Sequence, residues 1–179
     1  RTLIIGMGEV GCALLEVLRD YHSVCIDTNG QQKEVEGEFE IMHIAFPYSD
    51  RFVEQVKVYQ EKYKPKYTVV HSTCPVGTSR KLGAVFSPVV GLHPHLETSL
   101  KTFTKFLAGE QASEVADYFR RAGMKVYLVD SQETMEMAKL SQTTFYALMI
   151  EYVKDLKRRC DNHNLSFAEA YTLFSQNYN

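Results

Sequence analysis

The chain has 179 residues, 45% of them hydrophobic, and its 20 Lys and Arg nearly balance its 22 Asp and Glu. This length suits about one globular domain, and the composition excludes an intrinsically disordered protein. A net charge of −2 argues against a protein that binds nucleic acid through a strong basic excess.

Membrane and redox features of the sequence favour a cytoplasmic protein. No apolar run approaches the roughly 20 residues of a membrane-spanning helix, and the first residues contain no basic and apolar leader. The four cysteines are widely spaced without a CxxC pair, which predicts neither a disulfide framework nor a zinc ribbon. We therefore expect neither a membrane nor a nucleic-acid partner.

Short β-type runs alternate with helical patterns through the first part of the chain. The predicted strands are Thr2–Ile5, Ser23–Ile26, Glu40–Phe46, Tyr67–His71, Pro88–Leu92 and Lys125–Val129. The predicted helices are Glu9–Asp20, Asp50–Lys62 and Ser113–Ala122. This alternation is typical of a Rossmann-like, doubly wound α/β domain with a mostly parallel sheet. The short stretch from Asp27 to Glu40 indicates that one strand–helix unit of the full Rossmann order is missing.

The pattern changes at Gln132, after which neither glycine nor proline occurs. Apolar residues at helical spacing predict one long helix over 132–160 and a further helix over Asn164–Tyr178. Because so long a helix cannot bury its apolar surface on a small sheet, we expect a homodimer through it. We place the boundary near Asp130, with an α/β domain over 1–130 and a helical dimerisation and substrate segment over 131–179.

A glycine-rich turn links the first predicted strand to the first predicted helix. In a GxGxxG turn the first glycine permits the bend, the second lets a pyrophosphate approach the backbone, and the third allows close helix–sheet packing. The free N–H groups and the helix dipole then face the phosphates. The candidate cofactor-binding residues of this turn are Gly6, Met7, Gly8, Glu9, Val10 and Gly11.

An acidic residue follows the second predicted strand. Asp27 lies about twenty residues after the glycine turn, where a carboxylate accepts hydrogen bonds from a ribose. It would repel a 2′-phosphate, and Thr28 and its neighbours supply no arginine for one. The sequence therefore favours NAD over NADP. The alternatives are a Rossmann-like domain that binds another nucleoside, such as S-adenosylmethionine, or one that binds nothing.

Hydroxyl side chains follow the fourth predicted strand in the stretch STCPVGT. Ser72 and Thr73 lie at the sheet edge where open α/β folds bind ligands, so both are candidates for contact with a nicotinamide ribose or a substrate. The other interpretation is a capping turn, with Thr78 as the N-cap of the next helix; both can hold.

The long helix carries a candidate acid or base. Glu136, Lys139 and Thr143 share one helix face, and a lysine in a partly desolvated cleft can exchange a proton during hydride transfer. The alternative is a solvated lysine paired with Glu136.

Two histidines flank Pro94 after the fifth predicted strand. His93 or His95 is a candidate for hydrogen bonding or acid–base chemistry. We predict no metal site, because a third ligand is not evident. His43 and His71 are predicted as satisfied core or strand-end residues.

These motifs resemble the UDP-glucose/GDP-mannose dehydrogenase family, a branch of the 6-phosphogluconate dehydrogenase-like oxidoreductases. The glycine turn and Asp27 resemble its NAD site, and STCPVGT is similar to its STVPVGTT motif. Phe46-Pro47 stands where the family has V-P-T-P, which implies a cofactor contact. The stretch EMAKL resembles the start of its central helix, which makes Lys139 the counterpart of a catalytic lysine.

The sequence also departs from that family. Thr143 stands in place of an asparagine, and His95 in place of the glutamate of an S-P-E motif. His93-Pro94-His95 is weakly similar to the HP motif of prephenate dehydrogenases. The family's nucleophilic cysteine lies in a C-terminal UDP-binding domain beyond this chain, so the resemblance implies a truncated or divergent member.

The sequence thus predicts an NAD-dependent oxidoreductase with a small-molecule substrate. The resemblance implies that Thr73 lies near the nicotinamide and that Lys139, helped by Thr143 and His95, handles the proton. We expect a single hydride transfer on an alcohol or hydroxy acid. The alternatives are a catalytically inactive dinucleotide-binding module and an S-adenosylmethionine-dependent methyltransferase.

Overall fold

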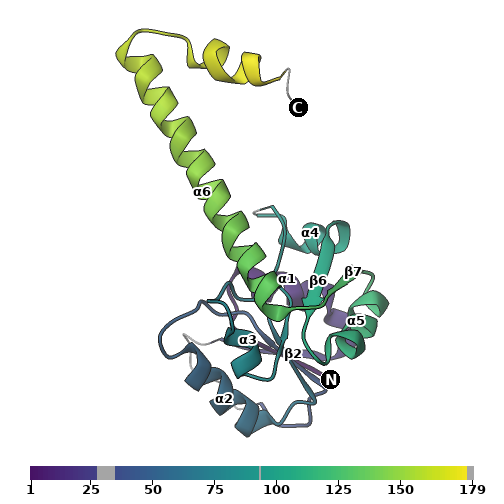
Figure 1. Ribbon diagram of the computed structural model, residues 1–179. Helices are drawn as coiled ribbons and strands as arrows, with labels where there is room; N and C mark the ends of the chain where they lie inside the picture. Colours follow the sequence, from purple (N-terminus) through teal and green to yellow (C-terminus); the bar gives the residue numbers. More distant parts are fainter. Residues whose placement is uncertain (28–34, 93, 177–179) are drawn as a thin grey trace. The chain divides into compact units, whose positions relative to one another are not determined.

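A computed structural model of the chain describes residues 1–27, 35–92 and 94–176 (Figure 1). The chain divides into two compact units, Arg1–Leu140 and Ser141–Asn179, and we describe each by itself. The functional boundary placed near Asp130 from the sequence stays a prediction.

The first unit is built on a sheet that has seven strands in the described residues, in the order β2-β1-β3-β4-β5-β6-β7. The strands are β1 (Thr2–Ile5), β2 (Ser23–Ile26), β3 (Ile41–Ile44), β4 (Tyr67–Val70), β5 (Val85–Phe86), β6 (Thr104–Ala108) and β7 (Lys125–Val129). Strands β1 to β5 are parallel, whereas β6 runs antiparallel to β5 and parallel to β7. The predicted Rossmann-like α/β fold with a mostly parallel sheet is confirmed.

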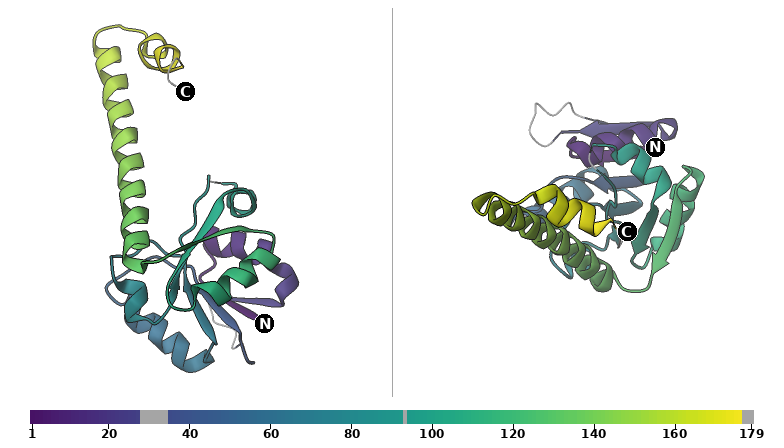
Figure 2. Two further views of the ribbon diagram at one scale, coloured as in Figure 1. Left: turned by 45° about the vertical axis from the view of Figure 1, so that its right-hand side comes forward. Right: turned by 90° about the horizontal axis from the view of Figure 1, so that it is seen from above.

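Helices cover both faces of this sheet (Figure 1). The first face carries α1 (Glu9–Val17), α4 (Leu96–Thr102) and α5 (Ala112–Arg121), and the second carries α2 (Phe52–Tyr63) and α3 (Thr78–Lys81). The left view of Figure 2 shows α1 and α2 with the sheet between them. A single turn of 3-10 helix, Arg19–Tyr21, precedes β2.

Burial on both faces explains why the central strands are almost wholly apolar. In β1, Ile4 packs toward α1 and α5, whereas Leu3 and Ile5 pack toward α2, because successive side chains of a strand point to opposite faces. The polar exceptions, which include His43 in β3 and Lys105 in β6, are buried as well.

The predicted strand Pro88–Leu92 is wrong. Strand β5 ends at Phe86, and residues 88–92 form neither helix nor strand. Ser87 N–H still donates to the Val70 carbonyl at 2.8 Å, but Pro88 has no N–H with which to continue the ladder. The sequence prediction also missed β6, which follows α4 directly.

The second unit contains most of α6 (Gln132–Asn162), a helix that begins in the first unit. The predicted long helix is confirmed. The predicted helix over Asn164–Tyr178 is confirmed over residues 167–175, with π-helical bonding at Ala168–Leu173. Its predicted start is wrong, since Asn164 adopts a positive φ of 53°. Tyr178 lies outside the described residues.

Large apolar side chains lie exposed on the second unit. They are Phe145, Tyr146, Leu148, Met149, Ile150, Tyr152, Leu165, Leu173 and Phe174. Despite these side chains, none of the described helices combines the length and apolar character needed to cross a membrane.

Candidate functional site

The carboxyl ends of β1, β2 and β3 lie side by side at one edge of the sheet. The chain leaves these strands at Gly6, Asp27 and Ala45. The Gly6 N–H donates to the Ile26 carbonyl at 2.8 Å, and the Ala45 N–H donates to the Ile5 carbonyl at 2.8 Å. Strand order reverses here, because β2 and β3 flank β1 on opposite sides. Open α/β sheets bind their ligands at such a switch point.

The glycine turn follows β1 and is packed tightly beneath and open above. Gly6 has a φ of +98°, and a Cβ atom there would lie 2.8 Å from the Ala45 carbonyl carbon. A Cβ atom on Gly11 would lie 1.9 Å from the Gly6 oxygen, so α1 approaches the turn as closely as only glycine permits. A Cβ atom on Gly8 would have no atom within 4 Å. The turn therefore leaves its backbone accessible at Gly8.

Helix α1 begins at this turn without a side-chain cap. Its N-cap is Gly8, whose backbone is extended. An uncapped helix start presents backbone N–H groups and the positive end of the helix dipole, which together can bind a phosphate. Met7 and Val10 pack partly against the core, so the surface of the turn is mainly backbone.

The Glu9 side chain belongs to a separate groove of about 230 Å³ between α1 and α4. Cys12, Glu16 and Glu97 also line this groove. Its three carboxylates make it unsuitable for a phosphate. Glu9 can therefore bind an anion at the glycine turn through its backbone N–H and not through its side chain.

The neighbouring loops place predicted residues at the same edge. Asp27 is exposed directly after β2, next to Gly6, whereas Thr28 lies outside the described residues. After β3, the Phe46 ring is buried 5.0 Å from the Phe52 ring, so only its backbone reaches the edge, and Pro47 is exposed. The Ser72 hydroxyl donates to the Phe46 carbonyl at 2.6 Å and joins this loop to the one after β4.

Thr73 is exposed in a loop whose continuation is held by Glu136 of α6. The Glu136 carboxylate is 0% exposed and accepts hydrogen bonds from the Gly77 N–H, the Ser79 N–H at 2.8 Å and the Ser79 hydroxyl at 2.6 Å. It therefore stabilises the uncapped start of α3. The alternative prediction, a solvated Lys139 paired with Glu136, is wrong for Glu136, because this carboxylate is buried and binds the turn Gly77–Ser79.

The N-cap of α3 is Gly77, with a φ of 86°, and not Thr78 as predicted. The Thr78 hydroxyl instead donates to the Pro75 carbonyl at 2.6 Å. The prediction was wrong because an N-cap at Gly77 needs no hydroxyl: Glu136 supplies the acceptor from another helix.

Lys139 lies half-buried on α6 near the end of β5. Its Nζ donates to the Val89 carbonyl at 3.0 Å. Burial lowers the pKa of Lys139 below its ordinary value, which brings a proton-accepting amine closer to the physiological range. Thr143 follows one helical turn later, in the second unit, and is exposed.

The structure does not join His95 to the other predicted catalytic residues. His95 is exposed at the N-cap of α4, and its carbonyl accepts from the Ser99 N–H at 3.0 Å. No described contact links the His95 imidazole to Lys139 or Thr73, and His93 lies outside the described residues. Among the residues that the structure describes, no three His, Cys, Asp or Glu side chains are grouped to hold a metal ion.

Sequence reasoning missed a buried polar cluster on the α5 side of the sheet. His43 Nδ1 lies 2.9 Å from His71 Nε2, and Lys105 Nζ lies 3.1 Å from His71 Nδ1. His43 and His71 are core residues as predicted, but His43 Nε2 has no hydrogen-bond partner, so the prediction of a satisfied histidine is wrong for His43. A lysine within an otherwise β-type run, as in TKFLA, was the only sequence signal.

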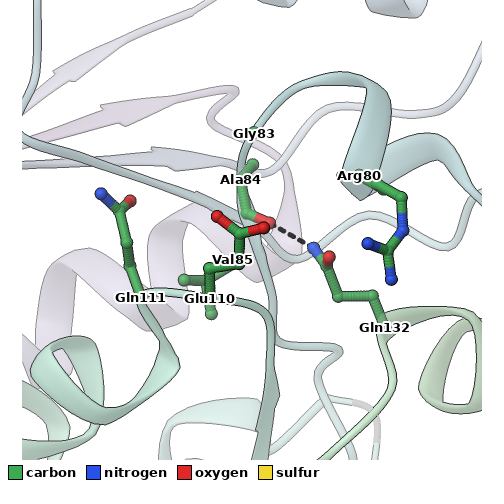
Figure 3. Close-up of a pocket in the computed structure, with 7 residues that line it drawn as sticks. All are labelled: Arg80, Gly83, Ala84, Val85, Glu110, Gln111 and Gln132. Atoms are coloured by element: carbon green, nitrogen blue, oxygen red, sulfur yellow. Dashed lines mark hydrogen bonds between the residues drawn. The ribbon is translucent and has the colours of Figure 1, made fainter.

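A second cavity, shown in Figure 3, lies away from this edge. Its seven lining residues are Arg80, Gly83, Ala84, Val85, Glu110, Gln111 and Gln132. Ala84 and Val85 stand at the start of β5, which is the opposite end of the parallel strands. With a volume of about 130 Å³, it is smaller than the roughly 300–1,000 Å³ of most small-molecule sites. The switch-point edge is therefore the better candidate.

Comparison with known proteins relates the chain to dehydrogenases by fold. No family model matches the sequence. The UDP-D-ManNAc dehydrogenase of Pyrococcus horikoshii superposes with a TM-score of 0.78 and 14% identity, over 97% of this chain and 57% of that one. The 3-hydroxyisobutyrate dehydrogenase of Mycobacterium tuberculosis superposes with a TM-score of 0.72 and 13% identity, over 98% of this chain and 69% of that one.

One curated relative, found by sequence, is named as a proteasome subunit and not as a dehydrogenase. The 26S proteasome regulatory subunit rpn-1 of Neurospora crassa is 33% identical over 81 residues, which are 45% of this chain and 9% of that protein. The chain thus spans a small part of this relative and little more than half of the Pyrococcus enzyme. At 13–14% identity, the structural comparisons show that this chain shares the fold of these two proteins, and they show the fold alone.

Proposed function

We propose that the chain binds NAD and transfers one hydride between it and the hydroxyl-bearing carbon of an alcohol or hydroxy acid. The observation that carries this proposal is the glycine turn at the switch point, open above Gly8 and uncapped at α1. In this proposal the enzyme resembles the nucleotide-sugar 6-dehydrogenases.

The described residues fit a dinucleotide. The backbone of Gly6–Gly11 would hold the pyrophosphate, and the space above Gly8 would take phosphate oxygens that a side chain at that position would exclude. Asp27, at the end of the adjacent strand, would accept hydrogen bonds from the adenosine ribose. Its charge would disfavour a 2′-phosphate, so we propose NAD and not NADP.

The proposed chemistry uses Lys139 as the acid–base group. When bound, the nicotinamide supplies a hydride acceptor. The substrate carbon loses a hydride as its C–H bond breaks, the carbonyl forms, and the uncharged Lys139 amine takes the hydroxyl proton. Thr73, exposed after β4, would contact the nicotinamide ribose or the substrate, with Thr143 and His95 as further substrate contacts.

Two relatives by fold support the choice of substrate class. A UDP-sugar dehydrogenase and a 3-hydroxyisobutyrate dehydrogenase both superpose on this chain, and their names specify a nucleotide sugar and a hydroxy acid. We propose that the substrate here is also a small molecule with an oxidisable hydroxyl group. We further propose that the working form is a homodimer through helix 132–160.

A substitution of Gly8 tests NAD binding, because a side chain at this position should hinder the ligand without disturbing the folded protein. Gly8→Ala places a methyl group where the protein has no neighbouring atom, so the thermal midpoint should stay unchanged while NAD affinity falls at least about tenfold. Gln111→Ala, at the N-cap of α5, is the matched control and should leave NAD affinity unchanged. Calorimetric titration of the wild type and of both variants with NAD, NADP and S-adenosylmethionine measures the affinity for each ligand. The proposal would be contradicted if Gly8→Ala bound NAD as tightly as the wild type does, or if the wild type bound S-adenosylmethionine more tightly than NAD.

Turnover is tested with UDP-sugars, hydroxy acids and prephenate at the NADH absorbance. Lys139→Met should abolish proton transfer and keep NAD affinity, and the wild-type rate of alcohol oxidation should rise with pH to a plateau below the ordinary lysine pKa of about 10.4. Activity retained in Lys139→Met would refute the assigned role of Lys139.

A dinucleotide-binding module without redox activity is the second candidate. The observation that favours it is that His95 and Thr143 stand where the dehydrogenase family that the sequence resembles has a glutamate and an asparagine. NAD binding without turnover of any substrate in the same panel would select this candidate.

A further inference from the structure

Lys105 is a buried amine that the proposed reaction does not use. It lies in β6 on the face covered by α5, is 2% exposed, and takes part in none of the ion pairs found among the described residues. Burying a charged amine without a carboxylate partner is costly. The contacts of this amine must therefore account for its position in the sheet.

Lys105 holds the segment that leaves β5. Its Nζ lies 2.7 Å from the Ser87 carbonyl oxygen and 3.0 Å from the Pro88 carbonyl oxygen. The next carbonyl in the chain, that of Val89, accepts the hydrogen bond from Lys139 Nζ. Three consecutive carbonyls are thus bound by two lysines from two different elements, β6 and α6.

The two buried histidines, His43 and His71, continue the hydrogen-bonded cluster from Lys105. His71 Nδ1 lies 3.1 Å from Lys105 Nζ, and His71 Nε2 lies 2.9 Å from His43 Nδ1. His71 Nδ1 also lies 2.7 Å from the Ser87 carbonyl oxygen, which can only accept, so this nitrogen carries the ring hydrogen. His71 Nε2 then accepts from the His43 Nδ1–H, which leaves only a lone pair on His43 Nε2. With His71 Nδ1 as a donor, Lys105 Nζ has two acceptors in this cluster, the Ser87 and Pro88 carbonyls, and an uncharged amine satisfies both with its two N–H groups.

The uncharged arrangement is the better satisfied one. The third N–H of an ammonium group would face the hydrogen on His71 Nδ1 or the Phe119 ring, and a buried N–H without a proper acceptor is costly. The groups that face Lys105 are His43 of β3, His71 after β4, Lys139 of α6 and the ring of Phe119 in α5, none of which is acidic. Burial, and then the charge of Lys139, lowers the pKa of Lys105 well below its ordinary value.

We propose that Lys105 is a positioning residue, whose uncharged amine fixes the Ser87 and Pro88 carbonyls and thereby sets the place at which the Val89 carbonyl holds Lys139. The inference rests on the proposed function in one respect, namely that Lys139 is the acid–base group. An uncharged amine suits this position, because a second ammonium group bound to the adjacent carbonyl would repel the Lys139 ammonium.

The first test measures the charge of Lys105 in the full chain without NAD or substrate. NMR spectra of protein labelled with 13C-lysine report the protonation of each amine through its Cε and Hε shifts, with Lys105→Met and Lys139→Met for assignment. At pH 7.5 we expect Lys105 to show the shifts of an uncharged amine, and these shifts should change in Lys139→Met. Ammonium shifts for Lys105, or shifts that do not respond to Lys139→Met, would overturn the proposal.

The second test measures Lys139 in Lys105→Met. Without Lys105 the carbonyl segment is no longer fixed, Lys139 becomes better solvated, and its titration midpoint should rise toward the ordinary value of about 10.4. Lys125→Met, which removes an exposed lysine of the same sheet, is the matched control and should leave the midpoint unchanged. An unchanged midpoint in Lys105→Met would also overturn the proposal.

A third measurement depends on neither assignment nor activity. If Lys105 is uncharged in the folded protein and charged when unfolded, the unfolded state binds one more proton. The unfolding equilibrium constant of the wild type, relative to Lys105→Met, should then fall up to about tenfold per pH unit as the pH rises from 7 toward 10. A ratio independent of pH contradicts an uncharged Lys105. All three results are obtained without NAD, so they stay distinct from a failure of NAD binding or turnover.

Discussion

The imidazoles of His43 and His71 illustrate how single buried residues can control stability in acid. Burial lowers the pKa of His43 to about 3. Burial also lowers the pKa of His71 well below its ordinary value. Both rings are therefore neutral when the protein is folded at pH 7.

We predict that the free energy of unfolding depends less steeply on pH in acid when His43 is replaced by a side chain that does not titrate there. Unfolded imidazoles bind protons below about pH 6.5 and the folded ones do not, so the stability present above that pH is lost as the pH falls toward about 3. Each histidine contributes a slope of up to about 1.4 kcal/mol per pH unit. His43→Asn should remove one such slope, measured by urea unfolding from pH 7 to 4.

The matched control for this prediction is His22→Asn. His22 is exposed and has a φ of 52°, a conformation that asparagine accepts readily. His22→Asn should therefore keep the wild-type dependence of stability on pH. Parallel pH profiles for His43→Asn and the wild type would contradict the prediction.

At the scale of elements, the contact between α6 and α3 depends on one carboxylate. Glu136 accepts bonds from two backbone N–H groups and one hydroxyl of the turn Gly77–Ser79, and it is fully buried. It substitutes for the missing N-cap side chain of α3 and ties the loop that carries Thr73 to α6. Helix starts are usually capped by a residue of their own helix, so this dependence on another helix is uncommon.

We predict that Glu136→Gln lowers the free energy of unfolding by about 2–4 kcal/mol, because an amide N–H2 then faces N–H donors that have lost their acceptor. Glu133→Gln, one turn earlier, weakens a surface pair with Arg80 and keeps an acceptor for the Ser131 hydroxyl, so it should unfold near the wild-type urea midpoint. Equal midpoints for the two variants would show that Glu136 does not stabilise α3.

The same elements show where sequence reasoning succeeds. Strands β1, β3 and β4 are buried on both faces, so a continuous apolar run between turn residues identifies each of them. The glycine turn was located equally well, because its sequence is fixed by steric contacts at Gly6 and Gly11. Local pattern and tertiary environment agree in these segments.

Elements that depend on distant partners were missed. Strand β5 has only two residues in the ladder, and the sequence pattern places the strand in the apolar run after it, whose Pro88 and Val89 carbonyls instead bind Lys105 and Lys139. Strand β6 contains the buried Lys105, and the acceptors that make this burial possible lie 17 and 18 residues earlier in the chain. A local pattern contains no information on such partners.

At the scale of the whole molecule, the order of strands follows from chain connectivity. Each strand of the parallel half is followed by a crossover, and the reversal between β2 and β3 produces one switch point, beside the glycine turn. The site's location could therefore be predicted from sequence. The surroundings of Lys139 could not, because the Val89 carbonyl comes from a segment predicted as strand.

The exposed apolar stripe of α6 leads to a prediction about assembly. Phe145, Leu148 and Tyr152 lie on one helix face at spacings of three and four residues, and Leu148 is 65% exposed in the single chain. Apolar side chains at this spacing are typical of helices that pack against another helix. We predict that two copies of the chain associate through this stripe.

Sedimentation of the wild type at micromolar concentration should show a dimer. Leu148→Lys introduces a charge into the buried stripe of each copy and should produce monomers, because burying an unpaired ammonium costs several kcal/mol. Ala147→Lys adds the same charge one residue earlier, rotated about 100° around the helix axis to the face away from the stripe, and should remain dimeric. A monomeric wild type, or dissociation of both variants alike, would contradict the prediction. The comparison thus separates a specific contact along the Phe145–Tyr152 face from a general effect of charge on the solubility of the helix.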